Sequence, residues 1–423
     1  MRSRRWDRVN PWRGLSGLPR EVWVLFAATL VNKAGSMVLP FFVLYLTREA
    51  GLSVQTASLV VLLYGAGALV AAPVAGRLSD RLGPISIMRG SLLLSGLVLL
   101  AFPFARSLPA IVVATLALSV TAEAFRPANL TIMGDLVAPE KRKTAFALNR
   151  LAINLGMSVG PALGGLLATV SFRWLFLVDG ATAVVAGVIL AASRFPPHRR
   201  TAELRQLEEA VAPHLRLPAG AHRDPRLLYF LAAMFPVAFV FFQHISSMPL
   251  YMVRDLELSE AAYGILFTVN TLLIVFLEVG INSATAHWPH RRTLALGSAL
   301  CGIGFGALAW ATDIWQVAAT VVVWTFGEML IFPGMADYLT DIAPEARRGE
   351  YMGLSQMMMG LAFTVGPWAG LQVLAVFGGE SLWLLMLALG LAAALMMSRL
   401  KGSGHRIAET DVPFPTTAPS TEP

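Results

Sequence analysis

The chain has 423 residues, of which 56% are hydrophobic and 14% are charged, whereas about a quarter of the residues of an average soluble protein are charged. This composition excludes an ordinary water-soluble protein and indicates a chain whose solvent is mostly lipid. The net charge of +7 does not indicate a nucleic-acid partner, because the basic residues are spread over short connections. The single cysteine, Cys301, excludes a disulfide framework or a cysteine metal cluster within one chain.

Apolar windows as long as a transmembrane helix, roughly 20 residues, recur along nearly the whole sequence. The first follows a basic leader, but it is too long for a signal peptide and lacks a clear small-residue cleavage site, so we expect a retained span. Clusters of charged residues, Gly and Pro separate the windows. The twelve predicted spans lie near 22–45, 56–75, 86–105, 108–136, 145–170, 174–194, 227–252, 261–284, 293–312, 314–340, 351–377 and 380–398.

The basic residues predict how these spans are oriented. With a cytoplasmic N-terminus and alternate crossings, 26 of the 33 Lys and Arg residues fall on the cytoplasmic side and 4 on the opposite side. Cytoplasmic loops of membrane proteins carry this excess of Lys and Arg. Because one missed or invented span would scramble the division, it favours both the number of spans and a cytoplasmic location of both termini.

The connection between the sixth and seventh spans is the one long internal loop. Within it, Leu204, Leu207, Val211 and Leu215 recur at steps of three and four, which is typical of an amphipathic helix on a membrane surface. The residues after 400 are rich in Pro, Thr and Ser, which predicts disorder. The expected organisation is a cytoplasmic basic N-terminus over 1–21, a six-helix bundle over 22–195, a cytoplasmic linker over 196–226, a second six-helix bundle over 227–400 and a disordered cytoplasmic tail over 401–423.

The two halves of the sequence match each other. DLVAPEKR from Asp135 is matched by DIAPEARR from Asp341, and LYLTREAGLS from Leu44 by LYMVRDLELS from Leu250, at an offset of 205 or 206 residues. Duplicated six-span units are characteristic of secondary transporters, whose substrate site lies between the halves near the membrane midplane. We therefore expect an all-α membrane protein with twelve transmembrane helices, built as two pseudo-symmetric six-helix bundles.

The predicted fifth span carries glycines four residues apart, one of them followed by proline. Glycines at this spacing let a neighbouring backbone approach closely, and proline removes one helical hydrogen bond and bends the span. The string resembles, at every fixed position, the G-x-x-x-G-P-x-x-G-G motif of bacterial twelve-span drug:proton antiporters in the major facilitator superfamily. Ordinary helix packing is the alternative interpretation. The motif residues are Gly156, Gly160, Pro161, Gly164 and Gly165.

The segment between the second and third spans, GRLSDRLG over 76–83, resembles the G-x-x-x-D-R-x-G signature of the same superfamily. The resemblance implies that its Asp and Arg lock the inner gate in the outward-open state. Basic residues usual after the signature are missing here, so a charge relay would depend on Arg81 or Arg89. A solvated turn is the alternative. The implied gate residues are Gly76, Asp80, Arg81, Gly83 and Asp135.

Several charged residues lie inside predicted spans. A charge at the bilayer centre costs roughly 2.5–3.5 kcal/mol, so such a residue usually faces a cavity or a partner. Burial disfavours the charged form of a carboxylate, which suits Glu123 and its counterpart Glu328, 205 residues later, to carry protons. An ion pair between Glu123 and Arg126 is the alternative. Arg126 and Asn129 partly match a further superfamily motif, R-x-x-Q-G, whose Arg faces the central cavity in proton-coupled members. The residues predicted to serve proton coupling and to line the cavity are Glu123, Arg126, Glu328, Lys33, Asn32 and Asn129.

Motifs of other function classes are missing from the sequence. Without a G-x-x-x-x-G-K-[ST] string there is no phosphate cradle for an ATP-driven pump. Without H-E-x-x-H or an arguable catalytic set, we expect no enzymatic activity, no cofactor and no metal site. The resemblance implies a monomeric, proton-coupled exporter of small amphiphilic molecules or drugs in the cell inner membrane, whose partners are the substrate, protons and the lipid bilayer. A proton symporter or uniporter that imports a nutrient, and a non-transporting receptor or scaffold, are the alternatives.

Overall fold

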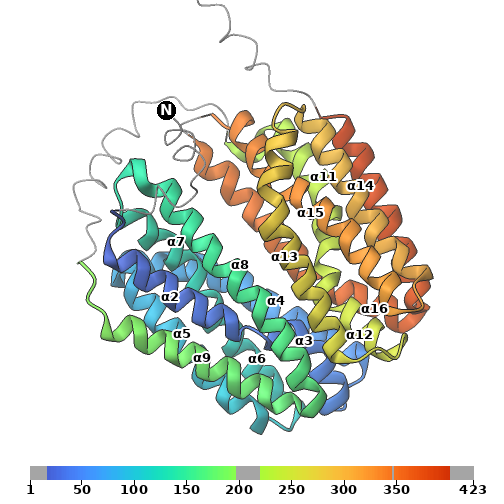
Figure 1. Ribbon diagram of the computed structural model, residues 1–423, viewed down its shortest axis with the longest axis horizontal. Coiled ribbons are helices and arrows are strands. Elements are labelled where there is room, and N and C mark those ends of the chain that lie inside the picture. Colours follow the sequence, from blue (N-terminus) through green and yellow to red (C-terminus); the bar gives the residue numbers. More distant parts are fainter. Residues whose placement is uncertain (1–16, 197–219, 345–346, 401–423) are drawn as a thin grey trace, which may run out of the picture.

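The computed structural model describes residues 17–196, 220–344 and 347–400, and every regular element in these ranges is a helix (Figure 1). Most of the predicted linker, with its amphipathic segment, and the predicted tail lie outside the described residues. The helices of the first half are α2 (Arg20–Gly35), α3 (Val38–Leu44), the π-helix η2 (Tyr45–Glu49), α4 (Val54–Leu82), α5 (Pro84–Ala101), η3 (Phe102–Phe104), α6 (Leu108–Glu123), α7 (Phe125–Asp135), α8 (Pro139–Val170) and α9 (Phe172–Ala192).

The second half repeats this order of long helices. Its first span is again interrupted, this time by a short 3₁₀ helix, η6. The helices of the second half are η5 (Ala221–Arg223), α11 (Pro225–Phe241), η6 (Phe242–Ile245), α12 (Ser247–Arg254), α13 (Glu260–Thr285), α14 (His290–Gly306), η7 (Ala307–Trp310), α15 (Ile314–Ile342) and α16 (Arg348–Ser398).

Eleven helical segments of the described chain are long and apolar enough to cross a membrane, and the last of them, α16, has 51 residues. At 1.5 Å per residue α16 would be about 77 Å long, far more than the roughly 30 Å of a bilayer core. Gly378, with φ of 82°, breaks α16 into two crossings. The described chain therefore has twelve spans, and the predicted all-α fold of two six-helix bundles is confirmed.

The duplication extends to single hydrogen bonds. The side chain of Ser53 accepts from the N–H of Thr56 at the start of α4, at 3.2 Å. Ser259, 206 residues later, accepts from the N–H of Ala262 at the start of α13, at 3.1 Å. Serine at this position satisfies a backbone N–H that has no partner inside the helix. Each half therefore begins its second span with the same cap.

Two helix pairs join the halves, namely α4 with α16 and α8 with α13. Between α4 and α16 the contact is close, because a Cβ added to Gly65 would stand 2.6 Å from the Cα of Thr364. If the two helices stayed side by side, Gly76 would face Gly353 further along. A Cβ on either of these glycines would instead meet no atom within 4 Å. The two helices therefore diverge.

The pair α8 and α13 stays in contact over a longer stretch. A Cβ on Gly264 would collide with the carbonyl oxygen of Pro161, and the hydroxyl of Thr268 donates to the carbonyl of Ser158 at 2.8 Å. Further along the pair, Arg150 of α8 still reaches Glu278 of α13. The two halves meet near α3 and α12 and diverge toward the opposite end (Figure 1).

Two names follow from this arrangement. We call the end of the bundle at which Ser53 and Ser259 lie the closed end, and the end at which Gly83 and His290 lie the open end.

Candidate functional site

The first span is interrupted where α2 ends at Gly35 and α3 begins at Val38. The interruption takes the N–H groups of Met37 and Val38 from their usual helical partners, and both donate to Oδ2 of Asp179 in α9, at 3.2 and 3.0 Å. Asp179 is only 8% exposed. A Cβ on Gly35 would collide with Thr182 of α9, so glycine is required for this approach. Asp179, which the predicted site did not include, thus holds the break in the first span.

Lys33 lies in the last turn of α2, directly before this break. Its ammonium group is within electrostatic reach of Glu123, Asp179 and Arg126. Within the described part of the chain it forms no hydrogen bond or ion pair. Lys33 is therefore a cation without a fixed partner next to two carboxylates.

Glu123 ends α6, and α7 begins after an interruption at Ala124. The hydroxyl of Tyr64 in α4 donates to Oε1 of Glu123 at 3.1 Å. Arg126 is exposed and forms no ion pair with Glu123 among the described residues. The alternative ion pair between Glu123 and Arg126 is therefore not formed in this structure.

Glu328 in α15 repeats the arrangement of Glu123. Asn270 of α13 donates to Oε2 of Glu328 at 2.9 Å and to the hydroxyl of Thr325 at 3.0 Å. Asn270 stands 206 residues after Tyr64, as Glu328 stands 205 after Glu123. Each half thus pairs a carboxylate of its fourth span with a hydrogen-bond donor of its second span.

Aromatic rings surround His244 in the second half. Its ring lies 4.5 Å from Phe241, 5.8 Å from Phe267 and 5.9 Å from Trp324, measured between ring centroids. Trp324 precedes Glu328 by one turn of α15, so the two share a helix face. The second half therefore packs a cluster of aromatic rings, with Trp324 buried in it, next to a carboxylate.

The two predicted cavity amides lie in different surroundings. Asn129 is 3% exposed and donates to Oδ1 of Asn149 in α8 at 2.9 Å. It therefore joins two helices of the first half instead of lining a space between the halves, because the rotation of α7 turns it toward α8. Asn32 is partly exposed, one residue before Lys33.

The glycines of α8 face the interrupted first span. A Cβ on Gly156 would stand 2.5 Å from the Cβ of Lys33, and one on Gly160 would stand 3.1 Å from the carbonyl oxygen of Ala34. Gly164 continues this row, since its added Cβ would stand 2.7 Å from the Cβ of Met37. Three of the predicted motif glycines thus fit α8 against the segment that carries Lys33.

The remaining residues of this motif face the other half of the protein. A Cβ on Gly165 would stand 2.7 Å from the carbonyl oxygen of Glu260. Pro161 presents its carbonyl oxygen to Gly264 of α13. Helix α8 is therefore packed between the break in the first span and the second half, so a movement of either changes its contacts.

The predicted gate segment forms a turn at the open end. Gly83 ends α4 with φ of 83°, and α5 begins at the next residue. Arg81 is exposed, and the side chain of Asp80 lies outside the described part. Arg89 donates to the carbonyl oxygens of Leu190 at 2.9 Å and Ser193 at 2.8 Å, so it is engaged with the end of α9 instead of with Asp135.

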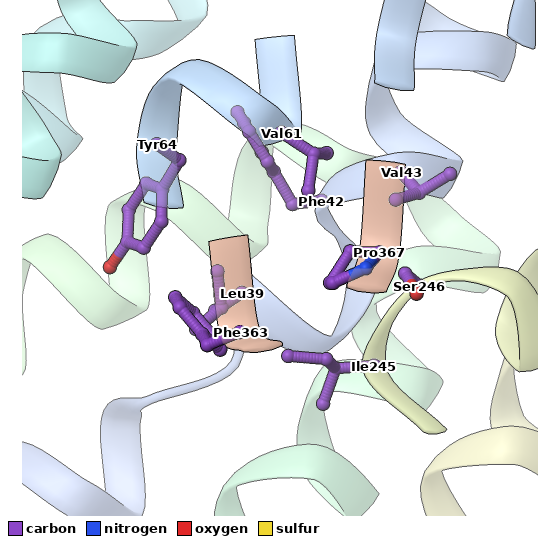
Figure 2. Close-up of a pocket in the computed structure, with 9 residues that line it drawn as sticks. All are labelled: Leu39, Phe42, Val43, Val61, Tyr64, Ile245, Ser246, Phe363 and Pro367. Atoms are coloured by element: carbon purple, nitrogen blue, oxygen red, sulfur yellow. The ribbon is translucent and has the colours of Figure 1, made fainter. Parts of the chain in front are cut away.

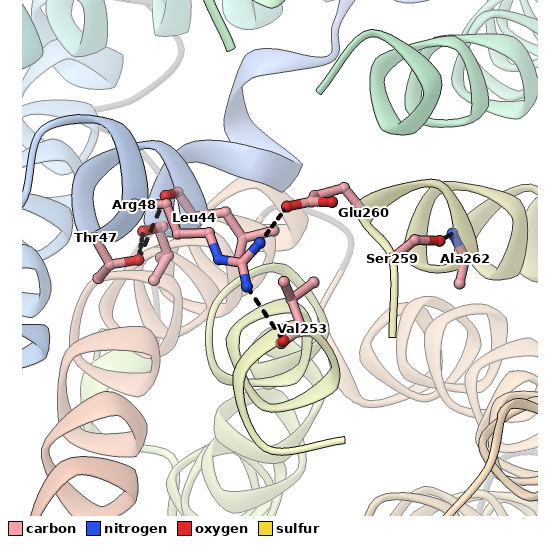
Figure 3. A network of polar contacts seen from close by, with 8 residues as sticks. Leu44, Thr47, Arg48, Val253, Ser259, Glu260 and Ala262 are labelled. Carbon is pink, nitrogen blue, oxygen red and sulfur yellow. Dashed lines mark hydrogen bonds and ion pairs between the residues drawn. The ribbon is translucent and has the colours of Figure 1, made fainter. Parts of the chain in front are cut away.

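An ion pair joins the halves at the closed end (Figure 3). Nη1 of Arg48 lies 2.7 Å from Oε1 of Glu260, and Nη2 donates to the carbonyl oxygen of Val253 at 3.4 Å. Beside this contact the halves enclose a cavity of only about 10 Å³, too small for more than one water molecule. It is lined by Leu39, Phe42, Val43, Val61, Tyr64, Ile245, Ser246, Phe363 and Pro367, drawn in Figure 2.

A second ion pair between the halves lies further toward the open end. Arg150 of α8 contacts Glu278 of α13 through Nη2 and Oε1. Arg150 is also within electrostatic reach of Glu328. Sequence analysis did not identify this contact, because it depends on how α8 and α13 are paired.

The arrangement places each of the two carboxylates close to a basic group. Glu123 has Lys33 near it, and Glu328 has Arg150. No group of three or more His, Cys, Asp or Glu residues in the described ranges could hold a metal ion.

Comparison with known proteins gives the same fold. The sequence matches the family profile described as Major Facilitator Superfamily over residues 24–259 and 244–419. It is 24% identical over 398 residues to "Uncharacterized MFS-type transporter YqjV" of Bacillus subtilis (strain 168), covering 91% of this chain and 96% of that protein. It is 21% identical over 351 residues to "Quinolone resistance protein NorA" of Staphylococcus aureus (strain COL), covering 82% and 88%. The crystal structure of a D-xylose-proton symporter superposes on 90% of this chain and 97% of its own, with a TM-score of 0.73 and 14% identity.

Proposed function

Because the chain belongs to the Major Facilitator Superfamily of transporters, we propose that it exports small amphiphilic molecules in exchange for protons, as a monomer. The observation that carries this proposal is a carboxylate at the equivalent place in each half. Glu123 and Glu328 are held at equivalent places by donors from the second span of each half. Two such groups on either side of the interface suit a protein whose halves rock against each other.

Export is favoured over import by two observations. The motif of α8 resembles that of drug:proton antiporters, and its glycines fit α8 against the segment that carries Lys33. A relative of similar length is named a quinolone resistance protein. The partly exposed rings of Phe241, His244 and Phe267, in the aromatic cluster near Glu328, suit a substrate that is largely apolar.

We propose the following cycle. With the closed end opened, a glutamate takes up a proton from outside as the substrate leaves. After the halves rock to the state seen here, the glutamate lies near a basic neighbour, Lys33 for Glu123 and Arg150 for Glu328. The proton then leaves to the cytoplasm and the site accepts the next substrate. Proton and substrate thus bind preferentially to opposite states, as exchange requires.

A proteoliposome experiment tests this function. With a pH indicator inside and membrane potential clamped, adding a substrate outside should make the lumen more alkaline, because substrate entry is exchanged for proton exit. Acidification would mean symport, and transport without a pH change would mean a uniporter. No substrate movement for any of a panel of drugs, siderophores, peptides and sugars would favour a receptor or scaffold.

We also propose that the open end faces the cytoplasm of a cell with this protein in its inner membrane. Both termini and the linker over 196–226 would lie on that side, between bundles over 22–195 and 227–400. A cysteine at Ser53 should react with an impermeant reagent added outside, and one at Thr201 only after permeabilisation. The native Cys301 is buried and should not interfere. The reverse pattern would invert the orientation.

Gly160→Leu is expected to abolish transport without preventing membrane insertion. A Cβ at this place already stands 3.1 Å from the Ala34 carbonyl oxygen, so a leucine forces α8 away from the break in the first span. Gly280→Leu is the matched control, because Gly280 has open space beside it. Normal efflux by the Gly160 variant at normal expression would mean that the motif serves only ordinary helix packing.

Arg48→Gln is expected to make the closed end open more often. A partly exposed ion pair contributes about 0.2–1 kcal/mol, so the population of the opposite state should rise up to about fivefold. Spin labels at Gln55 and Glu257 would measure the distance across the closed end. Arg254→Gln is the control, because this counterpart of Arg48 pairs only with its neighbour Asp255. Equal distance distributions in both variants would mean that the ion pair between Arg48 and Glu260 does not keep the closed end shut.

A further inference from the structure

A groove lies at the open end of the second half, between the start of α14 and the end of α16. Its volume is about 710 Å³, in the range of sites that bind small molecules. Helix α14 packs on α11, α15 and α16 and has no comparable packing against the first half. The groove is therefore separate from the proposed transport site.

Two arginines in this groove lack a carboxylate partner. Arg291 and Arg292 are both exposed, and within the described chain neither side chain forms a hydrogen bond or ion pair. The guanidinium of Arg292 lies over the ring of Trp288, 4.2 Å from its centroid. This stacking holds the charge in place without neutralising it.

Three of the other basic residues at this end are engaged. Arg89 donates to carbonyl oxygens at the end of α9, Arg142 donates to the Gly134 carbonyl oxygen at 3.2 Å, and Arg347 lies 3.5 Å from Glu350. No acidic residue lines the groove. Its two free guanidinium groups therefore favour an anionic ligand.

The groove also changes from charged to apolar along α14. Leu296, one turn after Arg292, lines the groove and is 40% exposed. Trp288 lies at the charged end, as tryptophan does at membrane interfaces. At the equivalent places in the first half stand Ile85 and Ser86, so the basic pair is not a consequence of the duplication.

We propose that this groove binds an anionic phospholipid from the leaflet next to the open end. The phosphate lies between Arg291 and Arg292, and one acyl chain follows α14 past Leu296. Bidentate arginine contacts suit a phosphate group, and juxtamembrane arginines attract anionic lipids. The proposal needs only that the chain spans a membrane, so it does not depend on the transported substrate.

Quenching of Trp288 fluorescence tests the proposal. The protein is reconstituted with phosphatidylglycerol or phosphatidylcholine brominated on the acyl chain near the headgroup, and the signal of Trp288 is the difference between wild type and Trp288→Phe. We expect phosphatidylglycerol to quench Trp288 at a roughly thirtyfold lower mole fraction, as two arginines at an anionic surface would give. Equal quenching by the two lipids would overturn the proposal.

Matched variants assign the preference to the groove. Arg291→Gln with Arg292→Gln should remove it, while quenching by phosphatidylcholine shows that the variant is folded in the membrane. Arg194→Gln with Arg223→Gln removes the same charge from exposed residues at the same end and should keep it. Loss in both pairs would mean general surface attraction. Loss on adding inorganic phosphate, but not chloride at equal ionic strength, would mean a free-anion site; either result overturns a lipid site.

Discussion

Glu328→Gln is expected to reduce pH-gradient-driven efflux to the rate of vesicles without protein, while substrate binding persists. Glutamine has nearly the shape of protonated glutamate and still accepts the hydrogen bond of Asn270, which spans 2.9 Å, but it cannot release a proton. Without that release, proton and substrate no longer favour opposite states. Glu123→Gln should have the same effect, because Tyr64 holds Glu123 in the equivalent way. Substrate uptake into everted membrane vesicles corresponds to efflux from the cell and gives its rate. A binding titration gives the affinity for the substrate.

Glu380→Gln is the control for both variants. Glu380 is an exposed glutamate at the closed end, so its replacement removes a carboxylate of the same kind without touching the site. If the Glu123 and Glu328 variants, alone and together, still drive uphill efflux with wild-type pH dependence, neither carboxylate carries the proton. Asp179 and Glu278 are then the next carboxylates to replace.

The fold could be predicted because apolar length and sequence offset belong to the sequence itself. The boundary predicted between the last two spans, 351–377 and 380–398, coincides with the break of α16 at Gly378. The same offset also contains a signal that the sequence analysis did not use. Tyr64 and Asn270 stand 206 residues apart, and aligning the halves around Glu123 and Glu328 would have identified both donors.

The contacts that were missed join helices far apart in the chain. Asp179 accepts from Val38 across 141 residues, and Arg150 meets Glu278 across 128. Such pairs depend on the rotation of each helix about its axis and on where a helix is interrupted. Neither property follows from apolar length or from charge counts. The same rotation turns Asn129, predicted to line the cavity, toward Asn149 within its own half.

Asp179→Ala is expected to destabilise the protein and to abolish transport. Its removal leaves the N–H group of Val38 without this acceptor, at about 1–3 kcal/mol for a buried unpaired group, and leaves that of Met37 only the Gly35 carbonyl oxygen at 2.7 Å. It also takes away one of the two carboxylates near Lys33, so less negative charge balances this ammonium. Asp179→Asn keeps an acceptor oxygen and should recover most of the stability, but not the charge. We therefore expect the asparagine variant to fold and still to transport poorly.

Asp313→Ala separates these two effects. Asp313 also accepts two backbone N–H groups, from Trp315 at 2.8 Å and Gln316 at 2.9 Å, but it caps an exposed helix end. Water replaces the lost acceptor there, so we expect a loss of about 0.5–2 kcal/mol and normal transport. Thermal unfolding in detergent and efflux from vesicles measure the two quantities. If Asp179→Asn transports like the wild type, the carboxylate serves only as a cap. Its charge then has no part in holding Lys33, and the basic partner of Glu123 must be sought in Arg126 instead.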